Sequence, residues 1–259
     1  MDVINTQKMQ RRFSGYDLKM IALVTMLIDH IAAVALRRYL QATNCESDIL
    51  DAIYELMRYI GRMAFPIYCF LLVEGFLHTR SVGKYALRLF AFALLSEVPF
   101  DMALKKSYFD WKSNNVFFTL LIGLLLIWGT TYVEKFYVFW KEKEYDSFIG
   151  VVLSLAAMAL LLVVACFSAD NILYTDYGMG GVLAIFVLYL LHKYRMLAYI
   201  LAVMVLYIFT DHIEILALFM LYPLMYYDGT RGKSMKYVFY VFYPAHLLIL
   251  AGLCMCFGI

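Results

Sequence analysis

Charged residues are scarce in this sequence. Asp, Glu, Lys and Arg together make up 16% of the 259 residues, whereas hydrophobic residues make up 64%. A soluble domain of this length could not bury so much apolar surface, so the surrounding solvent must be lipid. The formal net charge of +2 is also too small to indicate binding to nucleic acid. We therefore expect an integral membrane protein.

Cysteine is scarce as well, and its positions exclude two further classes of protein. Four of the five cysteines lie inside apolar runs, and only Cys45 falls in an expected loop. The sequence contains no CxxC pair and no Cys/His spacing typical of a metal site. We expect neither a disulfide framework nor a bound metal.

Long hydrophobic runs fill most of the sequence and predict an all-α, polytopic helical bundle. Residues 1–259 are expected to form one domain, with 1–15 as a cytoplasmic N-terminal segment, because no repeat or low-complexity tract interrupts the runs. The stretch 195–227 has such tight turns that a half-span is an alternative there. We expect about nine transmembrane helices, at 16–40, 53–78, 82–102, 115–133, 148–168, 177–192, 195–210, 212–227 and 236–257.

Basic residues are divided unevenly between the two sides of this arrangement. Fifteen fall on the side of the N-terminus and five on the opposite side. Because cytoplasmic loops carry an excess of Lys and Arg, this bias predicts a cytoplasmic N-terminus, an outward C-terminus and an odd number of spans. The five on the outer side are Arg37, Arg38, Lys105, Lys106 and Lys112.

The first apolar run, from Tyr16 to Leu40, carries ionisable residues at membrane depth. Lys19 lies near its inner end, and Asp29 and His30 lie beyond its middle. Such residues are costly in lipid and mark a functional site by default. Lys19 and His30 are eleven residues apart, so they share one helix face at a separation of roughly 16 Å.

Further polar residues are expected at the depth of Asp29 and His30, in the outer half of the membrane. Arg58 and Arg62 fall in the outer half of the second span, and His246 falls near the midplane of the last. The remaining members lie at the outer ends of other spans. They are Glu97, Asp101, Asn114, Asn115, Asp176, Asp211 and His212. The sequence therefore predicts one polar chamber that opens outward.

A histidine beside carboxylates and a buried arginine suits acyl transfer. Neutral His30 could take the proton of an incoming hydroxyl or amine, and a cation such as Arg62 could stabilise an oxyanion. Asp29 points about 100° away from His30 around the helix, so we expect it to pair with Arg62. Glu97 or Asp101 is expected to orient His30 or bind the acceptor, together with Asn115, Asp176 and His246. The alternative is an internal ion-pair lock between helices, and this alternative is favoured for Arg58.

The inner end of the bundle carries a basic stripe. Arg80, Lys84 and Arg88 recur every four residues near the level of Lys19, and Glu74 lies at the inner end of the second span. Guanidinium groups suit phosphates, so the stripe favours a phosphorylated cofactor that arrives from the cytoplasm. The ordinary positive-inside bias would explain the stripe equally well without a ligand.

Several long stretches resemble the TraX family of membrane proteins. They include SGYDLKMIALVTMLIDHIA, IGRMAFPIYCFLLVEGFLHTRSVGKYALRLFAFALLSEVPFD, NNVFFTLLIG and DYGMGGVLAIF, with the closest similarity over residues 14–125. The family is named for a conjugation protein that acetylates the N-terminus of F-type pilin. It is related to acetyl-CoA-dependent membrane acyltransferases of the acyltransferase-3 and heparan-glucosaminide acetyltransferase types. In the acyltransferase-3 type, a basic residue, ten intervening residues and a catalytic histidine mark the first span, which is the spacing of Lys19 and His30.

The resemblance implies that His30 is the catalytic base and that Lys19 contacts coenzyme A. It implies an acetyltransferase of the bacterial cytoplasmic membrane that uses acetyl-CoA and a peptide, pilin or glycan acceptor. It leaves open whether the chain forms a homo-oligomer, and it does not fix the roles of Arg62, Glu74, Glu97 or Asn115. A proton-coupled transporter with an Asp/Arg/Glu relay is the alternative from another class, and a structural subunit of a secretion or conjugation apparatus is a third.

Overall fold

The computed structural model describes residues 12–44, 47–143, 147–234 and 236–259, so Cys45 and most of the expected N-terminal segment lie outside the described residues. The described chain is helical and contains no β-strand. Its elements are α1 (Gly15–His30), the π-helix η1 (Ile31–Leu36), α2 (Arg37–Thr43), α3 (Asp48–Gly61), α4 (Ala64–His78), α5 (Val82–Leu104), α6 (Val116–Glu142), α7 (Ser147–Phe167), the π-helix η2 (Ser168–Ile172), α8 (Gly178–Leu190), the 3₁₀ turn η3 (His192–Tyr194), α9 (Arg195–Phe209), the 3₁₀-helix η4 (His212–Met220), α10 (Leu221–Met225) and α11 (Lys236–Cys256).

The helices confirm a multi-pass, all-α membrane protein. Each of the nine predicted spans corresponds to a helical segment, but the count of nine is approximate. Within the described residues, six segments are long and apolar enough to cross a bilayer: Gly15–Thr43, Asp48–His78, Val116–Glu142, Phe148–Ile172, His192–Phe209 and Tyr237–Cys256. The apolar segments Gly178–Leu190 and His212–Met225 are shorter, and α5 is long but carries four charged residues.

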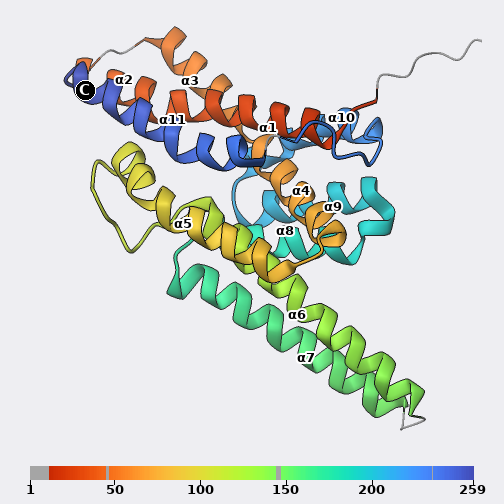
Figure 1. The fold of residues 1–259 in the computed structure, drawn as a ribbon. Coiled ribbons are helices and arrows are strands. Elements are labelled where there is room, and N and C mark those ends of the chain that lie inside the picture. Colours follow the sequence, from red (N-terminus) through yellow and green to blue (C-terminus); the bar gives the residue numbers. More distant parts are fainter. Residues whose placement is uncertain (1–11, 45–46, 144–146, 235) are drawn as a thin grey trace, which may run out of the picture.

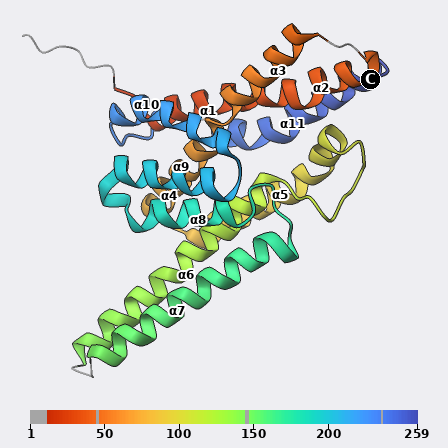
Figure 2. The same ribbon diagram turned by 180° about the vertical axis from the view of Figure 1, so that it is seen from behind.

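The helices pack in an arrangement that brings distant parts of the sequence together. Figure 1 shows α1, α2, α3 and α11 as one layer, with α4, α8 and α9 beside it. The antiparallel helices α6 and α7 extend away from the rest, as the view from behind in Figure 2 also shows. The C-terminus lies beside α2 (Figure 1), so the last helix runs alongside the first.

Several spans depart from regular α-helix, and three of these departures lie at the predicted outer chamber. The first span changes to a π-helix directly after His30. The second is interrupted at Arg62 and Met63, between α3 and α4. The eighth is a 3₁₀-helix over His212–Met220, where a half-span was the alternative. Because π-helical turns occur frequently at functional sites, these irregularities direct attention to the space between the three segments.

A glycine allows α3 to approach α1 closely at this point. Gly61 is buried, and a Cβ atom added to it would overlap the side chain of Asp29. Gly252 in α11 offers the opposite case, since a Cβ atom there would meet nothing within 4 Å. The two glycines therefore make a matched pair for testing this helix contact.

We predict that Gly61→Ala lowers the free energy of unfolding by about 1–3 kcal/mol, the usual cost of overpacking a core. Gly252→Ala should cause no loss, because alanine is the better helix former. Thermal unfolding of the two detergent-purified variants checks this. Equal melting temperatures would show that α3 does not approach α1 as described.

Candidate functional site

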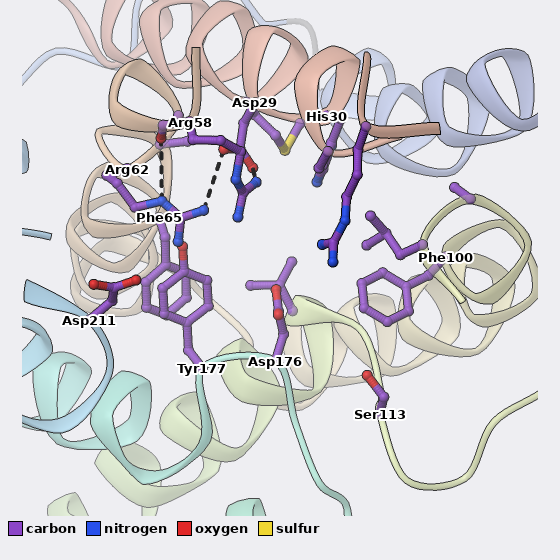
Figure 3. A pocket seen from close by; sticks show the side chains of 18 of the residues that line it. Asp29, His30, Arg58, Arg62, Phe65, Phe100, Ser113, Asp176, Tyr177 and Asp211 are labelled. Carbon is purple, nitrogen blue, oxygen red and sulfur yellow. Dashed lines mark hydrogen bonds and ion pairs between the residues drawn. The ribbon is translucent and has the colours of Figure 1, made fainter. Parts of the chain in front are cut away.

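A cavity of about 650 Å³ opens among these irregular segments. Its wall is formed by side chains from α1, η1, α2, α3, α4, α5, α11, η4 and the loop before α8. Figure 3 shows Asp29 and His30 on one side of this space and Asp176 and Tyr177 on the other. The lining residues come from the ends of the spans that were predicted to face outward. The predicted chamber is therefore present as a cavity.

An ion network joins three helical segments at this cavity. Arg58 Nη1 lies 2.6 Å from Oδ2 of Asp29, and Arg62 Nη2 lies 3.4 Å from Oδ1 of the same carboxylate. Arg62 Nη1 lies 3.2 Å from Oε1 of Glu214. The predicted pairing of Asp29 with Arg62 is confirmed, and Arg58 takes part in the lock that was favoured for it. Because both arginines already bind carboxylates, neither is free to stabilise an oxyanion as it stands.

A second histidine holds the ring of His30. Nε2 of His246 lies 2.6 Å from Nδ1 of His30, and Nδ1 of His246 lies 2.7 Å from the carbonyl oxygen of Phe242. A carbonyl can only accept, so the proton of neutral His246 is on Nδ1 and its Nε2 is an acceptor. Nδ1 of His30 must then be the donor. The remaining lone pair of neutral His30 is on Nε2, and His30 lines the cavity.

This partner differs from the one expected for His30. Glu97 or Asp101 was predicted to orient the ring, but Glu97 accepts a hydrogen bond from Asn115 Nδ2 at 2.5 Å. Asp101 accepts one from the backbone N–H of Asp110 at 2.7 Å. That prediction was wrong because depth in the membrane does not tell which helices face each other. The ring of Tyr243 also packs edge-on against His30, with centroids 5.9 Å apart.

Several residues predicted to bind the acceptor do not line the cavity. Asp101 and Asn115 are fully buried, and the oxygen of the Asn115 side chain accepts from the N–H of Phe117 and so caps α6. His246 is 5% exposed and acts behind His30. Asp176 does line the cavity, so it is the one residue of this group that an acceptor could contact directly.

Asp176 lies in the loop before α8, outside the membrane-spanning segments. Its side chain lines the open cavity and is accessible to solvent, although the surrounding protein reduces its contact with water. The resulting desolvation raises the pKa of its carboxyl group, and the charge of Arg62 opposes this shift. Beside it, the ring of Tyr177 stacks on Phe65 with centroids 3.6 Å apart. These aromatic rings form an apolar part of the wall next to the carboxylate.

At the end of the bundle predicted to face the cytoplasm, α11 contacts two of the basic residues assigned to the donor. The ammonium group of Lys19 lies 5.6 Å from the ring centre of Phe239. The neighbouring Tyr240 lies close to Arg88, whose guanidinium lies 5.8 Å from the ring centre of Tyr85. Lys19 and Arg88 thus lie against the adjacent residues Phe239 and Tyr240 of α11. The donor-binding role predicted for both cations stays a prediction.

The other residues assigned to the donor have different surroundings. Arg80 and Lys84 are exposed at the start of α5. Glu74 accepts a hydrogen bond from the hydroxyl of Tyr227 at 3.5 Å. Arg195 packs on the Tyr227 ring at 4.8 Å and donates to its carbonyl oxygen at 2.9 Å. Tyr227 thus links Glu74 of α4 to Arg195 of α9. Glu74 therefore has a structural function in addition to the predicted one.

Glu214 is the main site residue that the sequence reasoning missed. It is fully buried, and its Oε2 atom has no hydrogen-bond partner within the described residues. A carboxylate three residues after the singled-out Asp211 was the available signal, but the stretch read as an ordinary apolar span. The described residues contain no group of three or more His, Cys, Asp and Glu that could hold a metal ion.

Comparison with known proteins gives matches along nearly the whole chain. The family model described as "TraX protein" matches residues 14–254. A protein of Dichelobacter nodosus, named as a probable fimbrial assembly protein FimC of serogroup H1, is 29% identical over 267 aligned residues. The alignment covers 93% of this chain and 95% of that protein. No solved structure matches.

The ion network predicts a strong asymmetry between single and double substitutions. Arg62→Met leaves Glu214 buried without its cation, which should cost about 3–5 kcal/mol of unfolding free energy. Combining it with Glu214→Gln should recover much of this loss. The free energies of unfolding of the single and double variants are measured in mixed micelles. Lys112→Met, which removes an exposed cation, is the control. The network would be refuted if Arg62→Met were no more damaging than Lys112→Met.

Proposed function

This chain belongs to the TraX family, and from that premise we propose that it is an acetyltransferase of the bacterial cytoplasmic membrane. In this proposal it transfers an acetyl group from acetyl-CoA to the free amine of a peptide used in fimbrial or pilus assembly. The name of the Dichelobacter nodosus relative supports a function in fimbrial assembly. A glycan hydroxyl is the alternative acceptor.

The observation that carries the proposal is the hydrogen-bonded pair of His30 and His246 at the cavity wall. The 2.6 Å contact fixes the proton of His30 on Nδ1, so its Nε2 can accept a proton from an acceptor in the cavity. His246 thus does for the ring what a carboxylate does in many acyl-transfer sites, which is to fix the tautomer and the orientation. A transporter has no evident use for a histidine prepared in this way.

The proposed reaction needs no metal or redox partner. The amine nitrogen attacks the thioester carbonyl, and Nε2 of His30 takes a proton from the nitrogen. The C–N bond forms, the C–S bond breaks, and the proton passes from His30 to the departing sulfur. The products are the acetylated amine and free coenzyme A. The imidazolium formed in between keeps both ring protons and donates through Nδ1 to His246.

The donor is proposed to reach His30 from the opposite side of the membrane. Lys19 and Arg88 lie along α11 at the predicted cytoplasmic end, where they could bind the phosphates of coenzyme A. The extended pantetheine arm would then span the roughly 16 Å from Lys19 to His30 along the helix. Arg80 and Lys84 are proposed to add charge at the same end.

We predict that His30→Ala abolishes acetyl transfer while acetyl-CoA binding is retained, because the base is lost and the donor contacts are not. Saturable binding and release of free coenzyme A are measured on detergent-purified protein. Full activity of the variant would sink the assignment of His30. Absence of donor binding by folded wild-type protein would instead favour the proton-coupled transporter.

A second prediction concerns His246. His246→Leu should lower kcat about tenfold or more without changing KM for acetyl-CoA, because His30 loses the acceptor that fixes its tautomer. His246→Gln should restore part of the rate, since its amide oxygen can accept from Nδ1 of His30. Equal rates for the two variants would show that His246 only fills space.

A further inference from the structure

The rare cations of the outer side gather at the cavity. Only five Lys or Arg residues fall on the side predicted to face outward, and four of them line the cavity: Arg37, Arg38, Lys105 and Lys106. Topology does not account for this cluster, because the positive-inside rule disfavours cations on that side. A cluster kept against this bias calls for a ligand or a structural function.

Arg38 has the structural function. Its side chain is buried, and its guanidinium donates to the carbonyl oxygens of Met102 and Ala103, both at 2.7 Å. These carbonyls belong to the last turn of α5, where a cation is favoured. This contact fixes the end of α5 against the first span. Arg37 is the neighbour of Arg38 in the chain, so it lies close to this contact.

The other three cations have no such function. Arg37, Lys105 and Lys106 are exposed, and none of them takes part in the ion pairs between described residues, which join Arg58 and Arg62 to carboxylates. Lys105 and Lys106 follow the turn that Arg38 anchors, and Lys106 ends the helix with a left-handed φ of 57°. We call these three residues the basic mouth.

The charges deeper in the cavity differ from those of the basic mouth. Asp29 and Glu214 are paired with arginines, which leaves Asp176 and Asp211 as the lining carboxylates without an ion pair among the described residues. Asp176 faces the side of the cavity that carries His30 (Figure 3). The cavity therefore offers an anion opposite the proposed base and exposed cations along its wall.

The spacing between these two regions sets the size of the ligand. Arg37 follows His30 by seven residues, six of them in the π-helix η1, so at the α-helical rise the two lie at most about 10 Å apart along the axis. An extended peptide advances about 3.3 Å per residue, so three residues cover this distance. A cavity of about 650 Å³ lies within the usual range for ligand pockets.

We propose that the acceptor is a peptide with an acidic side chain at its third residue, which the basic mouth binds while the amine lies between Asp176 and His30. The proposal rests on the proposed acetyltransferase function and adds a specificity determinant to it. The cations would select the carboxylate by charge-assisted hydrogen bonds, and Asp176 would attract the amine before His30 removes its proton.

The test compares two peptide amides that differ only in charge, Ala-Gly-Asp-Gly and Ala-Gly-Asn-Gly. Purified protein in neutral-lipid nanodiscs, and in matched nanodiscs that contain anionic lipid, is supplied with acetyl-CoA, and kcat/KM is measured from the release of free coenzyme A. The Asp peptide should be preferred about tenfold or more. The triple variant Arg37→Gln, Lys105→Gln, Lys106→Gln should lose this preference and keep its rate with the Asn peptide, whereas Lys112→Gln should behave as wild type.

Three results would overturn the inference. One is a wild-type protein that acetylates both peptides equally or neither of them, and another is a triple variant that keeps the preference. The third is a loss of activity in the triple variant that follows anionic lipid content and not peptide charge, which would assign the basic mouth to lipid headgroups. The proposed function is judged separately, by the release of coenzyme A that depends on His30 without any peptide.

Discussion

The structure depends on one constraint, which is that charges inside a membrane must be paired. Asp29, Arg58, Arg62 and Glu214 meet this constraint together, and doing so fixes α1, α3 and η4 around a common space. An apolar interface would have let these segments close on one another. A network of charged side chains, which needs partners and room, instead leaves a polar cavity in the half of the bundle predicted to face outward.

The same network also frees His30 for chemistry. Asp29 is the neighbour of His30 in the sequence, but it is occupied by two guanidinium groups and points to another face of α1. The ring of His30 therefore takes its partner from α11, through His246 and the carbonyl of Phe242. The arginines serve the scaffold and the histidine pair serves the proposed reaction, so the two functions are separated although their residues are adjacent.

Much of this organisation could be predicted from the sequence, because hydrophobic runs and charge bias report position along the membrane normal. They gave the nine helical segments, the pairing of Asp29 with Arg62 and the level of the cavity, although α6 runs nine residues beyond its predicted end at residue 133. They could not give the position of each helix around the bundle. The contact between His30 and His246 joins residues 216 positions apart, and Glu214 lies in a segment whose 3₁₀ geometry no periodicity indicated.

The central claim is that donor and acceptor approach His30 from opposite sides of the membrane. It is tested most directly with right-side-out and inside-out vesicles that contain the protein, by supplying acetyl-CoA to one face and measuring on which face free coenzyme A is released. The account predicts release only when acetyl-CoA reaches the face that carries Lys19 and Arg88, with loss in His30→Ala. Turnover of acetyl-CoA supplied only to the face where the cavity opens would contradict it.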